Sequence, residues 1–233
     1  MDAAIVSFVR TNYFRGMRKQ AATTAIDDRL LDSAIEQFGR LGLEGASTRA
    51  LAAAAGAAMS SITYHYGSKE GLYLAAARRI ATQIAQRFAA ALDETPEPDS
   101  LDADEAAEQV VALADALLAM MLSSEAAAWS RFIVREQMEP TEAFSVLWDE
   151  IMGPVSRRLV KLVERAGQGR WKAADARVRA AAMIGQVLVF RVARAAVLKL
   201  TGWPDIGPAQ AGDIRRVLRS HIHAMLHARE VGE

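Results

Sequence analysis

The segment "MSSITYHYGSKEGLY", residues 59–73, concentrates hydrogen-bonding side chains in a short run. It holds three tyrosines, one histidine and four hydroxyl side chains. Short hydroxyls and aromatic rims can contact base edges, thymine methyl groups and phosphates in the major groove of DNA. The segment is therefore a candidate DNA interface, provided that the neighbouring helices present one of its faces to solvent.

Helix-start and helix-stop signals surround this segment. Ser47 is expected to cap a helix over residues 48–55, because its hydroxyl can accept a hydrogen bond from a backbone N–H. Gly56 permits a sharp turn, and a second short helix then carries residues 60–66. Two helices joined by a tight glycine-bearing turn predict a helix-turn-helix, whose second helix lies in the major groove.

The next helix is expected to offer a phosphate site at its start. Ser68 can cap it, and its free N–H groups, its positive dipole end and Lys69 would together attract an anion. Two caps are expected to be weak. Ala50 cannot complete a capping box with Ser47, and Ala58 has no hydroxyl to cap the helix that follows it.

The polar side chains of the motif are expected to divide between support and DNA contact. Ile62, His65 and Tyr66 have the spacing of residues that pack against the preceding helices, and Tyr66 is expected to be a core residue. His65 is open to either role. The residues predicted to contact DNA are Ser47, Thr48, Arg49, Ser60, Ser61, Thr63, Tyr64, His65 and Lys69.

The sequence here resembles a known family. Residues 24 to about 80, with the pattern "STRALAAAAGAAMSSITYHYGSKEGLY", are similar to the DNA-binding domain of the tetracycline-repressor (TetR) family of bacterial transcription regulators. The forms "ITYHYGSKEGLY" and "REQMEPTEAF" (residues 135–144) look more like its CecR-like branch. The resemblance implies an all-helical homodimer. Its N-terminal domain would read a palindromic operator in double-stranded DNA, and its larger C-terminal domain would bind a small organic effector that releases the DNA.

Composition agrees with a folded helical protein. The chain has 233 residues, 52% of them hydrophobic, which is enough for a sizeable core. It has no cysteine, so disulfides, thiolate metal sites and cysteine nucleophiles are excluded, and a cytoplasmic location is expected. Residues 3–9 form an apolar stretch too short for a membrane span, so no membrane partner is predicted.

Apolar residues recur at helical spacing nearly throughout, which predicts an all-α fold. The expected domains are a flexible leader over residues 1–22, a three-helix helix-turn-helix domain over 23–72, and an effector-binding and dimerisation domain over 73–233. The basic residues of the leader suggest either an arm for the DNA backbone or a segment that precedes a later start at Met17. Eight acids between Asp93 and Glu108, without an intervening Lys or Arg, predict a loop.

Two long C-terminal helices, expected over residues 173–199 and 208–228, carry broad apolar faces. One chain cannot easily cover both faces. Pairing them with a symmetry mate would give a four-helix bundle, so these helices are the predicted homodimer interface.

The middle helices are expected to hold the effector pocket, although an ordinary core with exposed charges would show the same pattern. Large, adaptable apolar residues and a few polar groups suit an apolar or amphipathic organic compound. The predicted effector-binding residues are Trp129, Phe132, Arg135, Met138, Phe144, Trp148 and Gln186.

Enzyme and metal functions are not expected. The sequence has no nucleophile motif and no phosphate loop, so no catalytic residue and no cofactor are predicted. His223 and His227 lie one helical turn apart, but no carboxylate or cysteine joins them at ligand spacing in the sequence. We therefore expect no metal there. The alternative to a DNA-binding regulator is a helical ligand-binding dimer without operator binding, because residues 23–72 are nearly neutral in charge.

Overall fold

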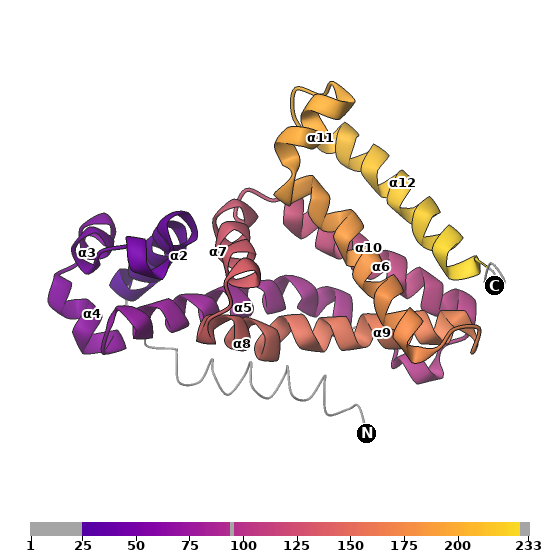
Figure 1. The fold of residues 1–233 in the computed structure, drawn as a ribbon, viewed down its shortest axis with the longest axis horizontal. Helices are drawn as coiled ribbons and strands as arrows, with labels where there is room; N and C mark the ends of the chain where they lie inside the picture. The colour runs from indigo at the N-terminus through magenta and orange to yellow at the C-terminus, as the bar shows by residue number, and fades with distance from the viewer. Residues whose placement is uncertain (1–24, 94–95, 229–233) are drawn as a thin grey trace. The chain divides into compact units, whose positions relative to one another are not determined.

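The computed structural model describes residues 25–93 and 96–228, which are almost entirely helical and contain no strand (Figure 1). The predicted all-α fold class is confirmed, whereas the predicted leader over residues 1–22 lies outside the described residues. The helices are α2 (Ala25–Gly45), α3 (Thr48–Ala55), α4 (Met59–Tyr66), α5 (Lys69–Asp93), η1 (Pro98–Ser100), α6 (Ala103–Leu122), α7 (Ala126–Met138), α8 (Glu142–Leu147), η2 (Trp148–Met152), α9 (Gly153–Gly167), α10 (Ala173–Val192), α11 (Arg194–Thr201) and α12 (Pro208–His227).

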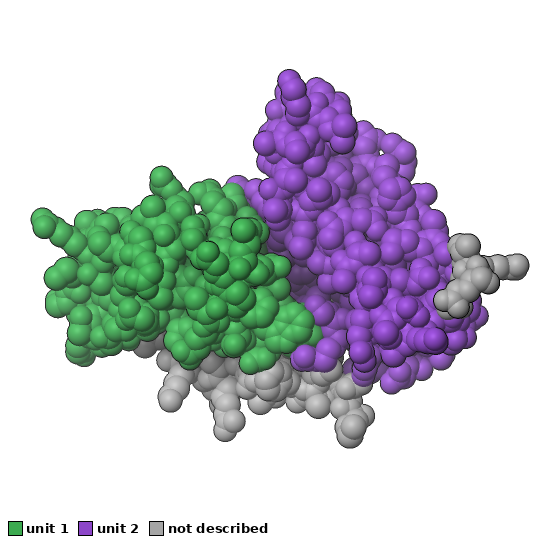
Figure 2. Space-filling view, viewed as in Figure 1, with its two compact units in different colours: residues 1–86, 127–154 green, residues 87–126, 155–233 purple. Residues whose placement is uncertain are grey.

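The chain divides into two compact units, coloured separately in Figure 2. Unit 1 contains the residues up to 86 together with 127–154, and unit 2 contains 87–126 together with the residues from 155 onward. The helix-turn-helix therefore shares a unit with α7, α8 and η2. The predicted functional boundary at residue 72 falls inside α5 and stays a prediction.

Three aromatic rings form the centre of unit 1. Tyr73 on α5 packs edge-on against Phe38 of α2, with 4.8 Å between the ring centroids, and the centroid of the Phe132 ring on α7 lies 4.6 Å from that of Tyr73. Gly39 lets α2 approach the backbone of α7, because an added Cβ would lie 3.1 Å from the carbonyl oxygen of Ala128. Burial of these rings and this close approach fix α2, α5 and α7 together.

Unit 2 is built around α6, which contacts both α10 and α12. Its start corrects one expectation, since residues 103–108 of the acidic run are helical rather than a loop. The Asp102 carboxylate accepts a hydrogen bond from the Glu105 N–H, and the Glu105 carboxylate accepts one from the Asp102 N–H, both at 2.8 Å. Acids at this end also suit the positive end of the helix dipole.

A glycine–proline pair usually ends a helix, but Gly153 and Pro154 open α9 directly after the π-helical turn η2, and Gly153 keeps helical angles (φ −63°, ψ −51°). Proline is tolerated in the first turn of a helix, because the N–H that it lacks would have no partner within the helix there. Conversely, the helix expected over residues 173–199 is interrupted at Ala193, and α10 and α11 meet at 83°.

No single helix within residues 25–93 and 96–228 is long and apolar enough to cross a membrane.

Candidate DNA interface

The first helix of the motif, α3, has the predicted local structure. The Ser47 hydroxyl accepts a hydrogen bond of 3.2 Å from the Ala50 N–H, so the predicted cap is confirmed. Gly56 ends the helix in the left-handed conformation (φ 64°), and its neighbour Ala57 donates from its N–H to the Ala52 carbonyl at 2.9 Å. Leu51, Ala52 and Ala55 form the buried face of α3.

The second helix, α4, exposes the side chains that were predicted to read DNA. Ala58 provides no side-chain cap, as expected, and Ile62 anchors the helix with 1% of its surface exposed. Tyr64 projects outward with 85% of its surface exposed, and Ser60 and Thr63 are exposed beside it. The Tyr64 ring contacts its neighbour His65 edge-on, with 4.9 Å between the centroids, and is otherwise largely exposed. The exposed side chains of α4 thus form a polar face suited to a DNA groove.

The remaining predicted DNA-contacting residues are close to solvent. Ser47 and Arg49 are exposed at the start of α3, whereas Thr48, Ser61 and Lys69 are partly exposed. Together these positions follow the outer ends of α3, α4 and α5 in unit 1.

His65 and Tyr66 face the body of unit 1 more than their neighbours do. The Nδ1 atom of His65 lies 3.6 Å from Oδ1 of Asp27, a buried carboxylate at the start of α2. Burial, and then the Asp27 charge, raise the pKa of Tyr66 to about 12. Tyr66 was expected to be a core residue, but it is only partly buried, because α4 packs into unit 1 mainly through Ile62. His65 combines an exposed edge with a contact to α2.

The start of α5 is tightly built. The Ser68 hydroxyl accepts a hydrogen bond of 3.1 Å from the Gly71 N–H, which confirms this cap. Hydrogen bonds from the Ser68 side chain and from its own backbone N–H lower the pKa of Glu70. Two of the N–H groups that could bind an anion are thus already engaged. A phosphate at this end would depend mainly on the charge of Lys69 and on the helix dipole.

Side chains outside the motif hold α5 against α2. The Arg79 guanidinium donates from Nη1 to Asp28 Oδ1 at 2.8 Å and from Nε to Asp32 Oδ1 at 2.9 Å. Both carboxylates lie on α2, one turn apart. This two-pronged contact sets the direction in which α5 leaves the helix-turn-helix.

A buried carboxylate connects α5 to the segment between α7 and α8. Glu136, with 1% of its surface exposed, accepts a hydrogen bond of 2.6 Å from the Tyr73 hydroxyl. Its other oxygen accepts from the Thr141 N–H at 3.1 Å and from the Thr141 hydroxyl at 2.9 Å. Glu136 is one of the polar groups that sequence reasoning placed beside the predicted effector pocket, and with Thr141 it lies within the "REQMEPTEAF" segment, whereas Asp27 was not singled out as a site residue.

The predicted effector-binding residues occupy varied environments. In unit 1, Trp129 and Phe132 are buried in the core, Met138 is 78% exposed, and Phe144 stacks on the half-exposed Trp148 with 6.2 Å between centroids. Arg135 packs beside Gly42, where an added Cβ would lie 3.1 Å from its Nη1. In unit 2, Gln186 lies on α10 and donates to the sulfur of Met225 at 3.2 Å. An effector site at these residues stays a prediction.

A capped helix-turn-helix with an exposed polar second helix is the architecture of a DNA-binding regulator. The family model described as bacterial regulatory proteins of the tetR family matches residues 30–76. The chain is a helix-turn-helix transcriptional regulator of the TetR family.

Within that family it belongs to the CecR group. The model described as the C-terminal domain of the HTH-type transcriptional dual regulator CecR matches residues 106–229. The CecR protein of Shigella flexneri is 30% identical over 208 residues, covering 84% of this chain and 89% of the relative. The regulatory protein RaaS of Mycobacterium tuberculosis is 47% identical over 64 residues, covering 28% of this chain and 30% of that protein.

Solved structures share the fold. A transcriptional regulator from Pseudomonas aeruginosa has a TM-score of 0.61 at 19% identity, over 85% of this chain and 89% of that one. The regulator FadR from Bacillus subtilis, solved with stearoyl-CoA, has a TM-score of 0.57 at 14% identity, over 85% of this chain and 97% of that one. A regulator from Saccharomonospora viridis, solved with choline, has a TM-score of 0.57 at 20% identity, over 84% of this chain and 94% of that one.

Proposed function

We propose that the protein acts as a cytoplasmic homodimer that binds a palindromic operator and is released from it by a small organic effector. The observation that carries the proposal is the exposed face of α4, where Tyr64, Ser60 and Thr63 project from a helix anchored by Ile62. In a dimer, two such helices would enter successive major grooves about 34 Å apart. A palindromic operator matches that symmetry.

The dimer surface of the proposal is an exposed stripe on α10 and α12. Val178, Val189 and Val192 on α10 are 69%, 41% and 57% exposed. Small exposed residues lie between them at helical spacing, namely Ala181, Ala182 and Gly185. Val217 on α12 is 42% exposed. Such a stripe of valines and small residues permits close helix approach and suits a four-helix contact with a second copy.

The effector of the proposal is an apolar or amphipathic organic compound. Two structural neighbours were solved with organic ligands, stearoyl-CoA and choline. The stacked Phe144 and Trp148 of unit 1 offer aromatic surface for such a compound. Because coupling is reciprocal, operator DNA should weaken effector binding by the same factor by which the effector weakens operator binding.

Fluorescence anisotropy with DNA from the promoter next to the gene tests the operator step. We expect saturable binding of one dimer per site, competition by unlabelled promoter but not by random DNA, and an affinity that falls steeply with salt. Equal affinity for promoter and random DNA at physiological salt would contradict operator recognition. No DNA binding at all would favour the helical ligand-binding dimer.

Whether the protein represses or activates its promoter is tested by a separate experiment. We propose repression, while the relative from Shigella flexneri carries the name of a dual regulator. A reporter under the same promoter, with and without the gene, should show higher expression when the gene is absent. Lower expression in its absence would indicate activation instead.

A further inference from the structure

The first residue of α4 is an exposed methionine that is not among the predicted DNA contacts. Met59 has 57% of its surface exposed. Ile62 on the same helix is 1% exposed, so Ile62 rather than Met59 is the main packing residue of α4. A large apolar side chain thus faces solvent beside the polar face of the proposed recognition helix.

Met59 lies at the end of α4 that contacts bases in this architecture. In a helix-turn-helix, the N-terminal residues of the recognition helix reach the base edges. The two residues before Met59, Ala57 and Ala58, have side chains of a single methyl group and leave the start of the helix uncrowded. Thr63 is exposed four positions further on, one turn along the same flank of the helix. The thioether chain of Met59 and the methyl group of Thr63 therefore give this flank an apolar character.

The residue types of α4 limit the bases that it can read. In the major groove, guanine is contacted most often by Arg or Lys, and adenine by Asn or Gln, through paired hydrogen bonds. The sequence of α4, "MSSITYHY", contains none of these four residue types. Arg49 lies on α3 and Lys69 on α5, so neither belongs to this helix. Apolar side chains instead contact the C5-methyl group of thymine.

We propose that α4 recognises its operator through thymine methyl groups and that Met59 is the residue that contacts them. This inference rests on the operator binding proposed above and specifies the chemistry of the half-site. The unbranched, polarisable side chain of methionine adapts to irregular surfaces. Its contact with a methyl group removes apolar area of both partners from water, which favours binding. The half-site should therefore carry thymine at the position that faces the first turn of α4.

Replacement of thymine by uracil removes this methyl group and keeps the hydrogen-bonding groups of the base. Anisotropy titrations of the full-length protein compare the promoter fragment synthesised with thymine and the same fragment synthesised with uracil. Burial of one methyl group corresponds to about a 4-fold change in affinity. Loss of one contact in each half-site should therefore weaken binding by about 15-fold. Random-sequence DNA, in both forms, should show no such difference.

Substitutions at Met59 test which side chain contacts the methyl groups. In Met59→Ala and Met59→Gln the ratio of the two affinities should fall below about 3-fold, because alanine is too short and glutamine presents an amide. Met59→Leu keeps an apolar chain and should retain most of the thymine preference. Leu200→Ala, which removes an 88% exposed apolar side chain from α11 in unit 2, is the matched control and should leave the ratio unchanged. Melting curves followed by circular dichroism establish that each variant is folded.

Equal affinity of the wild type for the thymine and uracil promoters, with random DNA bound more weakly, would overturn the inference and leave operator binding intact. A uracil penalty that persists in full in Met59→Ala would assign the methyl contact to another residue and overturn the role of Met59. Equal binding of promoter and random DNA would contradict operator binding itself, and the inference with it. A thymine preference that falls in Met59→Ala and Met59→Gln but persists in Met59→Leu and Leu200→Ala would establish the contact.

Discussion

The hydroxyl of Tyr73 donates a 2.6 Å hydrogen bond to the buried carboxylate of Glu136, which lies 63 residues further along the chain. Because Tyr73 also packs between Phe38 and Phe132, one side chain connects the helix-turn-helix, α5 and α7. Burial and this hydrogen bond raise the pKa of the Tyr73 phenol. The contact is a central element of unit 1.

Tyr73→Phe should destabilise the protein by about 1 to 3 kcal/mol, because a buried carboxylate oxygen loses its donor. Urea unfolding followed by circular dichroism measures the change. Tyr64→Phe removes a hydroxyl from an exposed ring and is the control, for which no loss is expected. Equal stability of Tyr73→Phe and the wild type would show that the hydrogen bond contributes nothing.

Ala58→Ser should stabilise the start of α4. Ala58 has the extended backbone of a helix N-cap (φ −72°, ψ 144°) but no side-chain hydrogen bond. A serine hydroxyl there would accept from a backbone N–H and add about 0.5 to 1 kcal/mol. Ala54→Ser, at an exposed position inside α3, should instead be neutral or slightly destabilising. The thermal midpoint should therefore rise in Ala58→Ser and stay unchanged or fall slightly in Ala54→Ser.

Lys69→Ala should weaken binding to all DNA sequences alike, because the predicted contact of the Lys69 side chain is with a phosphate rather than with a base. The slope of log affinity against log salt should fall by about one phosphate contact. Anisotropy titrations at several salt concentrations give this slope. If the slope does not change, Lys69 does not contact a phosphate.

Tyr64→Ala and Thr63→Ala should change the preference among operator sequences. Loss of a base contact would cost about 1 to 3 kcal/mol on the preferred operator and little on random DNA. Both side chains are exposed, so the unfolding free energy should stay close to that of the wild type. Similar losses on specific and random DNA would assign these residues to the DNA backbone instead.

The raised pKa of Tyr66 predicts that the protein loses stability at alkaline pH. Burial and the Asp27 charge raise the pKa of its phenol from the ordinary value of 10.0 to about 12, so ionisation of the phenol disfavours the folded state. This contribution is fully present below pH 10 and is lost as the pH rises toward about 12. Unfolding between these pH values should be less pH-dependent in Tyr66→Phe than in the wild type. Tyr73 contributes to the same loss in both proteins and provides no difference between them.

Local chemistry explains why the helix-turn-helix could be predicted from sequence. The caps formed by Ser47 and Ser68 and the turn at Gly56 each depend on residues within three or four positions. Their residue types are therefore readable directly. The start of α6 was misread because the run of acids suggested a loop, although acids next to Asp102 are also a helix-start signal.

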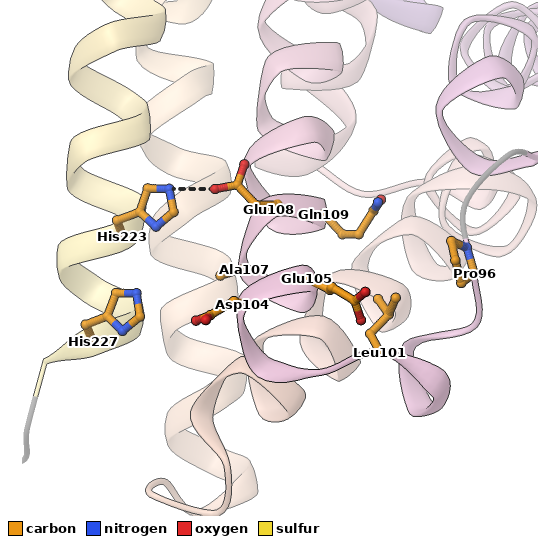
Figure 3. A pocket seen from close by; sticks show the side chains of 9 residues that line it. All are labelled: Pro96, Leu101, Asp104, Glu105, Ala107, Glu108, Gln109, His223 and His227. Carbon is orange, nitrogen blue, oxygen red and sulfur yellow. Dashed lines mark ion pairs between the residues drawn. The ribbon is translucent and has the colours of Figure 1, made fainter.

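Contacts between distant segments could not be predicted in the same way. No feature near Tyr73 indicates that its partner is Glu136, and nothing at Ala193 marks the break between α10 and α11. The carboxylate of Glu108 approaches His223 from another helix, 115 positions away in the sequence (Figure 3). The sequence therefore contains no sign of this ion pair.

The corner between α4 and α5 has a consequence for how this regulator can diversify. A Cβ on Gly71 would lie 1.9 Å from the carbonyl oxygen of Tyr66, so no larger residue fits and the corner is fixed. Ser60, Thr63 and Tyr64 on α4 are exposed and take no part in this corner. Gene duplicates could exchange these side chains and acquire new operators while the scaffold stayed unchanged. Paralogues that share the glycine corner could therefore control different promoters without cross-regulation.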